Sequence, residues 1–187
     1  NFKGLNLTIE TLDGLLKHNG PINNTRLYKN ILNNNLFDNK IIFKNFPSME
    51  AQVANISDDI AYNNHDLEDG LRAGLFTLEK FSSLSLISEI ISKHIKKIKN
   101  FRKEIIINHI VRDLINLMVV DVINTTNKNL KLIKPRNIKD IYIQDRLLVD
   151  FSPKMKKIIN QIKDFLKMNM YNHSKTKRNT NKGKKIL

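Results

Sequence analysis

The chain has 187 residues, of which 41% are hydrophobic, and it carries 32 Lys and Arg against 18 Asp and Glu, a formal net charge of +14. This length and composition allow one domain with a substantial core. The absence of cysteine excludes disulfides and thiolate metal sites. No apolar run approaches the roughly 18 residues of a membrane span and no leader pattern is evident, so we expect a cytoplasmic protein without membrane contact.

In chain order, residues 4–19 predict a turn followed by a helix, with Thr8 as N-cap and Asn19-Gly20-Pro21 as its end. Residues 22–47 are rich in Asn and predict irregular structure with short helical pieces. A long amphipathic helix is expected within residues 48–75, with Ser48 as N-cap. Its buried face is predicted from residues spaced three, four or seven apart, namely Met49, Val53, Ile56, Ile60, Leu67 and Leu71.

Two further helices are expected over residues 84–99 and 101–127, and the second is apolar enough on all sides to predict burial between neighbours. Residues 138–151 predict a short extended or helical link after Pro135. Ser152 and Pro153 then fit an N-cap and a first helical residue, with the helix running to about residue 171. Residues 174–187 contain six basic and no acidic residues, which predicts a disordered tail after a domain at 1–173. Every strong signal is helical, so we predict an all-α fold.

Residues 48–79 form an acidic segment in this basic chain, because they contain seven acidic residues and only Arg72 as a cation, a net charge of −6. This reversal suggests a cation or a cationic partner. Asp58, Tyr62 and Asp66 follow one another at intervals of four, in a loose stripe roughly opposite the apolar helix face. The stripe admits two interpretations, a solvated acidic face or a surface that binds a metal and a ligand.

Three stretches resemble the bacterial deoxyguanosine-triphosphate triphosphohydrolase-like branch of the HD-domain superfamily: GLNLTIETLDGLLKHNGP at 4–21, ANISDDIAYNNHDLEDGLRAGL at 54–75 and LVDFSPKMKKIINQIKDFLKMNMYNH at 148–173. The resemblance covers nearly the whole chain up to His173. It implies that Asp58 is the last protein ligand of an active-site metal, and that Tyr62 packs on the deoxyribose. It also implies that Asp66 accepts a hydrogen bond from the sugar 3′-hydroxyl and that Lys17 contacts phosphates.

The motif that names the superfamily, an early His followed by a His-Asp pair, is not found in the chain, and His65-Asp66 belongs to the late helix instead. The resemblance places the other three metal ligands and the catalytic residues in that upstream segment. The sequence also opens at Asn1, so we expect a C-terminal portion with no catalytic residue of its own, a partial HD-type domain at 1–173 that is inactive alone. The sequence departs from the family after His173, which predicts an altered C-terminus.

The resemblance therefore implies hydrolysis of a deoxynucleoside triphosphate to deoxynucleoside and triphosphate, with a divalent metal, Mn or Mg, and a homo-oligomer in the complete enzyme. The alternative is a non-catalytic basic helical protein that binds nucleic acid or a partner subunit. The charge does not separate the two, because triphosphate and nucleic acid are both polyanions. Abundant Lys, Ile and Asn are also typical of an A+T-rich genome. Nucleic acid binding is expected through the basic tail at 174–187.

Overall fold

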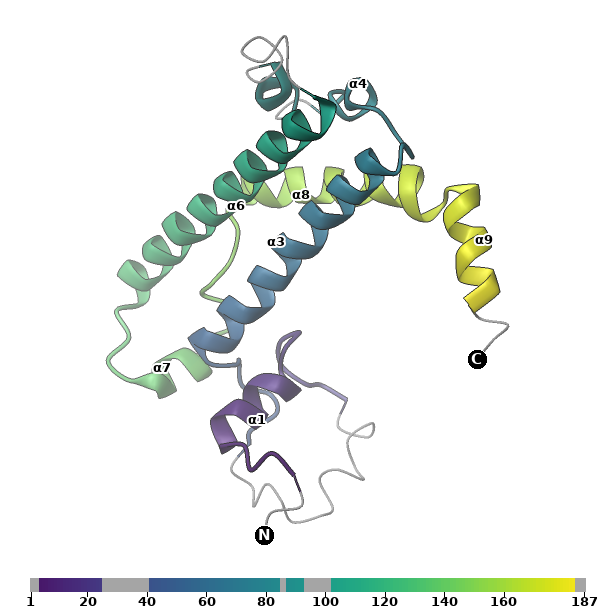
Figure 1. The fold of residues 1–187 in the computed structure, drawn as a ribbon. Coiled ribbons are helices and arrows are strands. Elements are labelled where there is room, and N and C mark those ends of the chain that lie inside the picture. Colours follow the sequence, from purple (N-terminus) through teal and green to yellow (C-terminus); the bar gives the residue numbers. More distant parts are fainter. Residues whose placement is uncertain (1–3, 25–40, 85–86, 93–101, 184–187) are drawn as a thin grey trace. The chain divides into compact units, whose positions relative to one another are not determined.

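The computed structural model describes residues 4–24, 41–84, 87–92 and 102–183, with the side chains of residue 103 and of residues 179–183 left out. These ranges contain helices and no strand, so the predicted all-α fold is confirmed. The helices are α1 (Ile9–Leu16), α3 (Met49–Arg72), α4 (Leu78–Phe81), α6 (Lys103–Ile133), α7 (Ile138–Tyr142), α8 (Pro153–Leu166), the π-helix η2 (Lys167–Tyr171) and α9 (Ser174–Gly183) (Figure 1).

The chain divides into two compact units, which are described separately below. The first unit comprises Asn1–Asp58 and Ile123–Asp150, and the second comprises Asp59–Val122 and Phe151–Leu187. The long helices α3 and α6 each contribute residues to both units. In the described part of the chain, none of the helices combines the length and the hydropathy needed to cross a membrane.

Three helices begin where the sequence predicts. The hydroxyl oxygen of Thr8 accepts a hydrogen bond from the Thr11 backbone N–H at 3.3 Å, and that of Ser48 accepts from Ala51 at 3.4 Å. Ser152 accepts from the Met155 N–H at 3.2 Å, and Pro153 follows it in the first turn. Each hydroxyl satisfies a backbone donor that the first helical turn leaves unpaired.

In the first unit, a buried Gln52 side chain ties α3 to a distant loop. Its amide oxygen accepts from the backbone N–H groups of Leu148 and Val149 at 2.8 and 3.1 Å, and its amide nitrogen donates to the Pro47 carbonyl at 2.9 Å. Gln52 is 2% exposed, so these hydrogen bonds satisfy an amide that is shielded from water.

The predicted link after Pro135 contains α7. This helix begins with a capping box formed by Asn137 and Asp140.

In the second unit, α3 and α6 lie side by side and antiparallel. The Arg72 guanidinium donates to the Asn108 side chain at 2.7 Å, and the Asn64 amide donates to Met118 Sδ at 3.3 Å, so later residues of one helix meet earlier residues of the other. The core of this unit is apolar, with Leu67, Leu71, Phe81, Ile87, Ile110, Leu114, Met118, Ile162 and Leu166 all essentially inaccessible to solvent.

An aromatic cluster joins α8 to the segment after α3 in this second unit. The Phe76 and Phe165 rings meet edge to face with centroids 4.9 Å apart, and Phe81 lies 5.4 Å from Phe165. Phe76 also packs against the backbone of Gly70, where an added Cβ would come within 2.3 Å of the ring. The absence of a side chain at position 70 is therefore what lets this ring reach α3.

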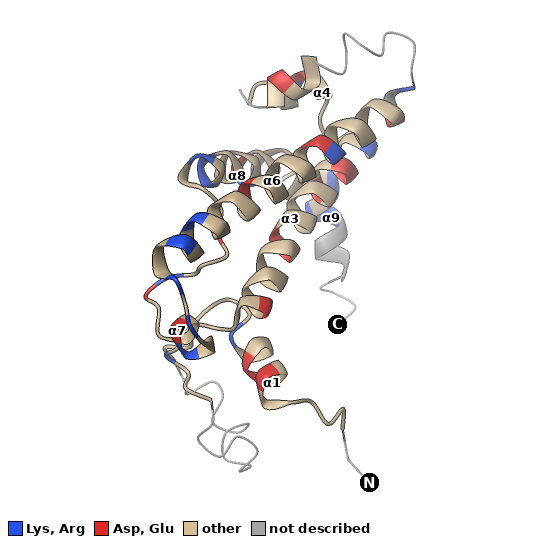
Figure 2. Cartoon of the chain, turned by 90° about the vertical axis from the view of Figure 1, so that its left-hand side faces the viewer, with Lys and Arg blue, Asp and Glu red and all other residues tan. Residues whose placement is uncertain are grey.

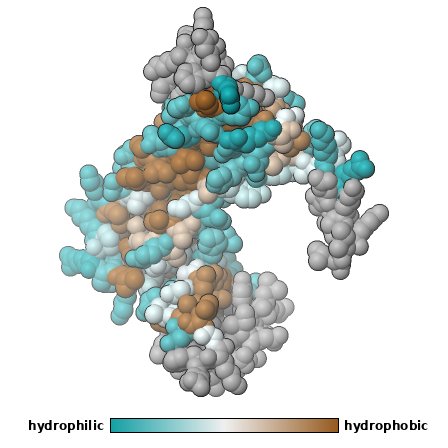
Figure 3. Space-filling model, viewed as in Figure 1, coloured by the Kyte–Doolittle hydropathy of each residue, from teal (hydrophilic) through white to brown (hydrophobic). Residues whose placement is uncertain are grey.

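Two predicted burial patterns are wrong. Val53 was placed on the buried face of the central helix but is 48% exposed. Helix α6 was expected to be covered on all sides, yet Leu117, Val120 and Ile123 are 37%, 45% and 53% exposed, and hydrophobic side chains gather over α6 at the surface (Figure 3). The reason is that α6 buries one stripe, Ile110, Leu114 and Met118, while apolar composition alone does not show which side faces the core.

Some helix boundaries also differ from the predictions. Helix α6 continues past residue 127 to Ile133 and ends at Lys134, which has a φ of 49° before Pro135. The central helix ends at Arg72, and Gly74 with a φ of 65° turns the chain after it. Of the helix expected over 84–99, residues 87–92 are helical, and 85–86 and 93–99 lie outside the described residues, as does most of the Asn-rich segment.

The tail expected to be disordered from residue 174 instead contains α9, Ser174–Gly183. The Lys177 N–H donates to the His173 carbonyl at 3.0 Å, which continues the hydrogen-bond ladder from the preceding turn. No proline interrupts residues 174–183, so the chain is free to continue as a helix. Residues 184–187 lie outside the described ranges. The boundary between a domain at 1–173 and a separate tail remains a prediction.

Candidate functional site

Six of the seven acidic residues of the segment at 48–79 lie along α3, as Figure 2 shows, and the seventh, Glu79, lies in α4. Asp58, Tyr62 and Asp66 are all helical and follow one another by four residues on this helix. The first of them belongs to the first compact unit, whereas Tyr62 and Asp66 belong to the second. The predicted metal ligand and the predicted sugar-binding residues therefore lie in different units.

In the first unit, Asp58 lies near a histidine that comes directly after α1. Its carboxylate oxygen Oδ2 is 3.9 Å from His18 Nε2, with side-chain exposures of 77% for Asp58 and 43% for His18. The pair is an ion pair only when the imidazole is protonated. His18 has a carboxylate partner here, a role that its place at the end of a helix did not indicate.

Lys17, predicted to contact phosphates, is buried in the first unit. Its ammonium is 2.6 Å from Asp13 Oδ1 and 6.0 Å from the centre of the Tyr142 ring, and its side chain is 2% exposed. A buried ammonium is stable only with such a partner. A phosphate could reach Lys17 only after this ion pair opens, so the predicted contact requires a rearrangement of the end of α1.

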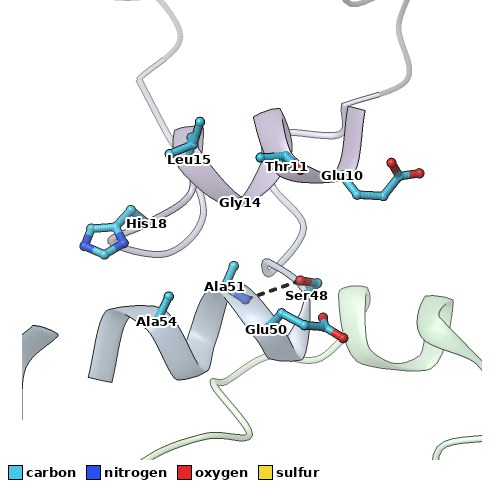
Figure 4. Close-up of a pocket in the computed structure, with 9 residues that line it drawn as sticks. All are labelled: Glu10, Thr11, Gly14, Leu15, His18, Ser48, Glu50, Ala51 and Ala54. Atoms are coloured by element: carbon cyan, nitrogen blue, oxygen red, sulfur yellow. Dashed lines mark hydrogen bonds between the residues drawn. The ribbon is translucent and has the colours of Figure 1, made fainter. Parts of the chain in front are cut away.

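A pocket of about 390 Å³ lies between α1 and the start of α3 in the same unit (Figure 4). Small residues form its floor, because a Cβ on Gly14 would lie 3.2 Å from that of Ala51. Glu10, Glu50 and His18 supply its ionisable groups. Hydrogen bonds from its own backbone and from Ser48 lower the pKa of Glu50 below its ordinary value, so this carboxylate stays charged at neutral pH.

In the second unit, Tyr62 and Asp66 meet a third residue, Tyr171, at the end of the π-helix η2. The Tyr171 hydroxyl donates to Asp66 Oδ2, and its oxygen lies 3.3 Å from that of Tyr62. Tyr62 is 56% exposed, while Asp66 is half-buried because Tyr171 covers it. Burial is the largest cause that raises the pKa of Tyr171 well above its usual value, and the hydrogen bond to Asp66 is the second.

Tyr62 and Tyr171 border a groove of about 550 Å³ in the second unit, between α3 and the segment formed by α8 and η2. Asp66 does not line this groove and adjoins it through its hydrogen bond with Tyr171. Tyr62 and Tyr171 supply aromatic rings, and Asn63 and Asn172 supply amides. Lys163 lies in the same groove with its ammonium 3.5 Å from Asp59, and Lys167 lies one turn further on. The groove thus offers two rings for stacking, two amides, and the two lysines beside two carboxylates, Asp59 and Asp164.

Tyr171 was not among the predicted site residues, although it lies in the stretch at 148–173 that carried the resemblance. Sequence spacing could not find it, because its contact with Asp66 joins residues 105 positions apart. The Met-Tyr-Asn-His string at 170–173 was the available signal. The structure brings Tyr171, Tyr62 and Asp66 together, so the second unit contains a cluster with two phenols and one carboxylate.

A metal ion would find one predicted ligand in this chain. Among the described side chains, no three His, Cys, Asp or Glu residues are grouped so that they could hold a metal. Stable divalent-metal sites use several ligands together, and Asp58 supplies one carboxylate. The described residues therefore do not by themselves fit the metal that the resemblance implies.

The whole chain is similar to curated proteins named deoxyguanosinetriphosphate triphosphohydrolase-like protein. It is 48% identical over 186 residues to that of Pelagibacter ubique, covering 100% of this chain and 50% of the relative. The proteins from Bartonella henselae and Parvibaculum lavamentivorans are 38% and 35% identical over 192 and 190 residues, again covering 100% of this chain and 48% of each relative. No protein-family model matches the chain.

These similarities confirm the predicted relationship to the deoxyguanosinetriphosphate triphosphohydrolase-like proteins. The chain that carries them is all-helical in its described residues, with an acidic central helix. The chain is homologous along its entire length to the deoxyguanosinetriphosphate triphosphohydrolase-like proteins. It spans about half the length of the curated relatives it matches.

Proposed function

We propose that this chain forms part of a deoxynucleoside triphosphate triphosphohydrolase, an enzyme that releases deoxynucleoside and intact triphosphate with the help of a divalent metal, Mn or Mg. The observation that carries the proposal is the cluster of Tyr62, Tyr171 and Asp66 in the second unit, in a chain homologous throughout to proteins of that name. Tyr62 and Tyr171 of this cluster line the groove. In this proposal Tyr62 packs on the deoxyribose and Asp66 accepts from its 3′-hydroxyl.

Asp66 has acceptor positions left for such a sugar hydroxyl even with Tyr171 in place. An ionised carboxylate offers about four lone-pair positions, and Tyr171 uses one of them. The exposed face of Tyr62 is apolar and can cover a sugar ring. Lys163 and Lys167 line the groove beside Asp59 and Asp164, and in this proposal their ammonium groups donate to the phosphates of the nucleotide.

Asp58 is proposed as one of several metal ligands, and Lys17 as a phosphate contact. Asp58 is exposed and could accept an ion whose other ligands come from elsewhere. Lys17 is buried against Asp13, so its role requires that ion pair to open. The reaction at the metal needs ligands beyond Asp58, so the testable part of the proposal within this chain is the sugar site.

The test compares deoxyguanosine with 2′,3′-dideoxyguanosine, which lacks only the 3′-hydroxyl, by titration followed with NMR. We expect wild-type protein to bind deoxyguanosine about tenfold more tightly, the equivalent of ~1.4 kcal/mol for a hydrogen bond to a charged acceptor. Asp66→Asn should abolish most of that preference, because the amide is a weaker acceptor. Asp69→Asn, which removes the same charge from an exposed position on the same helix, should retain it.

The comparison of two ligands isolates the hydroxyl contact from general effects on the fold. Equal affinities of wild-type protein for the two nucleosides would contradict the assignment of Asp66. Repeating the titration with deoxyadenosine, deoxycytidine and thymidine would show which base the groove prefers, a property that the sequence does not specify.

A further inference from the structure

The positive charge of this protein is concentrated at one end of the chain. Residues 153–187 contain 11 Lys and Arg and a single acidic residue, Asp164, a net charge of +10. The other 152 residues contain 21 basic and 17 acidic residues, a net charge of +4. A genome-wide preference for Lys codons would act on the whole gene, so it does not explain why acidic residues are nearly absent from this segment alone.

The structure exposes basic side chains of this segment in two places on the second unit. Lys175, Lys177 and Arg178 are exposed on α9, and Lys154 and Lys157 are exposed in the first turns of α8. We call these five residues the basic surface. Lys163 and Lys167 are not included, because they line the groove beside Tyr62.

The composition of α9 distinguishes among anionic partners. A helix that lies on a membrane needs an apolar face to enter the lipid. The residues of α9, SKTKRNTNKG, include no large apolar side chain. Protein interfaces rely on buried aromatic or aliphatic anchors, which α9 also lacks. Nucleic acid differs, because Lys and Arg gain affinity for its phosphates by releasing condensed counterions, without any apolar contact.

We propose that the basic surface, Lys154, Lys157, Lys175, Lys177 and Arg178, binds nucleic acid through its phosphates and without sequence preference. Binding of this kind positions the polymer but reads no bases, since every nucleic-acid sequence presents the same phosphates. The proposal does not depend on triphosphohydrolase activity, because none of these five residues lines the groove beside Tyr62.

The test measures fluorescence anisotropy of a labelled mixed-sequence single-stranded oligonucleotide with the full chain, across about 50 to 200 mM salt. The variant Lys175→Gln/Lys177→Gln/Arg178→Gln removes three charges from α9. The matched control Lys128→Gln/Lys131→Gln/Lys139→Gln removes three exposed charges from the first unit, so both variants have the same net charge.

We expect the α9 variant to weaken binding by about tenfold or more and to reduce the slope of log K against log salt by about 2, since each lost phosphate contact contributes about 0.7 to 0.9. The control should keep most of the wild-type slope. Equal losses in the two variants would overturn the proposal, because net charge and not this surface would then control binding. Binding to anionic phospholipid vesicles with no affinity for the oligonucleotide would overturn it as well.

No described side chain of α9 is buried, so the variant should keep the helicity of the wild-type protein, measured by circular dichroism. If helicity falls, the pair Lys154→Gln/Lys157→Gln tests the same surface from α8. That pair should reduce the salt slope by about 1 to 2. An unchanged slope in this second variant, with its helicity intact, would equally contradict the proposal.

Discussion

The Tyr171 hydroxyl donates a hydrogen bond to one carboxylate oxygen of Asp66, the residue that is proposed to bind the sugar 3′-hydroxyl. The hydrogen bond holds the end of η2 against α3 within the second unit. Burial and the neighbouring carboxylate raise the pKa of Tyr171, because both disfavour the phenolate. The residue is therefore a neutral hydrogen-bond donor throughout the physiological pH range.

We predict that Tyr171→Phe lowers the free energy of unfolding by about 1 kcal/mol at pH 7, the net value of one partly exposed hydrogen bond. Because the raised pKa belongs to the folded state, the folded protein retains the phenolic proton where the unfolded chain, with a pKa near 10, loses it. The difference in stability between wild type and Tyr171→Phe should be full below about pH 10 and shrink as pH rises above it.

Urea unfolding followed by circular dichroism at pH 7, 9 and 10.5 measures this difference. A stability difference that grows between pH 9 and 10.5 would contradict the assigned direction of the pKa.

At the scale of single elements, the end of α3 depends on a close approach between helix backbone and ring. Gly70 is the point of contact, since a Cβ there would lie 2.3 Å from a carbon of the Phe76 ring and 2.6 Å from a second one. Phe76 in turn contacts Phe165 of α8. This one position therefore connects α3 to the aromatic cluster that also fixes α8 and the start of η2.

We predict that Gly70→Ala destabilises the protein by about 1 to 3 kcal/mol, because the ring must move in a packed core. The direction of this change in stability is informative, because alanine in place of glycine in an exposed helix interior would stabilise the protein by about 1 kcal/mol. Thermal unfolding of Gly70→Ala beside Ser57→Ala, an exposed position on the same helix, measures the effect. A Gly70→Ala protein as stable as wild type would show that Phe76 does not pack there.

For the molecule as a whole, the relation to longer relatives raises the question of what this chain does by itself. The chain spans about half of their length, and the resemblance assigns it one metal ligand, Asp58. A single exposed carboxylate binds a divalent ion weakly, because metal sites gain their affinity from several ligands acting together. Activity in this chain alone would require ligands that neither the resemblance nor the described residues supply.

We predict that the isolated chain releases no triphosphate from dGTP with Mn²⁺ above the level of Asp58→Ala. A fusion of this chain to the half of a close relative that the chain does not match should be active. Asp58→Ala in that fusion should then remove the activity. Triphosphate release from a panel of deoxynucleoside triphosphates measures both. Metal-dependent release by the isolated wild-type chain, absent in Asp58→Ala, would show that the chain holds a complete site.

The sequence by itself determined the all-α class, three helix starts and the relationship to the triphosphohydrolase-like proteins. These depend on local information, since the hydroxyls of Thr8, Ser48 and Ser152 act on backbone groups three residues away, and helical periodicity is a property of neighbours in the chain. The relationship is also carried by contiguous strings of residues.

Only the tertiary structure decided which apolar residues are buried and which polar residues meet. Val53 and Val120 fit a helical pattern as well as their buried neighbours do, but exposure depends on what packs against them. Lys17 was predicted to contact phosphates, but in the structure it is buried against Asp13 and close to the Tyr142 ring. Tyr171 reached Asp66 because η2 returns to α3 after about a hundred residues, a proximity that depends on the path of the whole chain and leaves no periodic trace in the sequence.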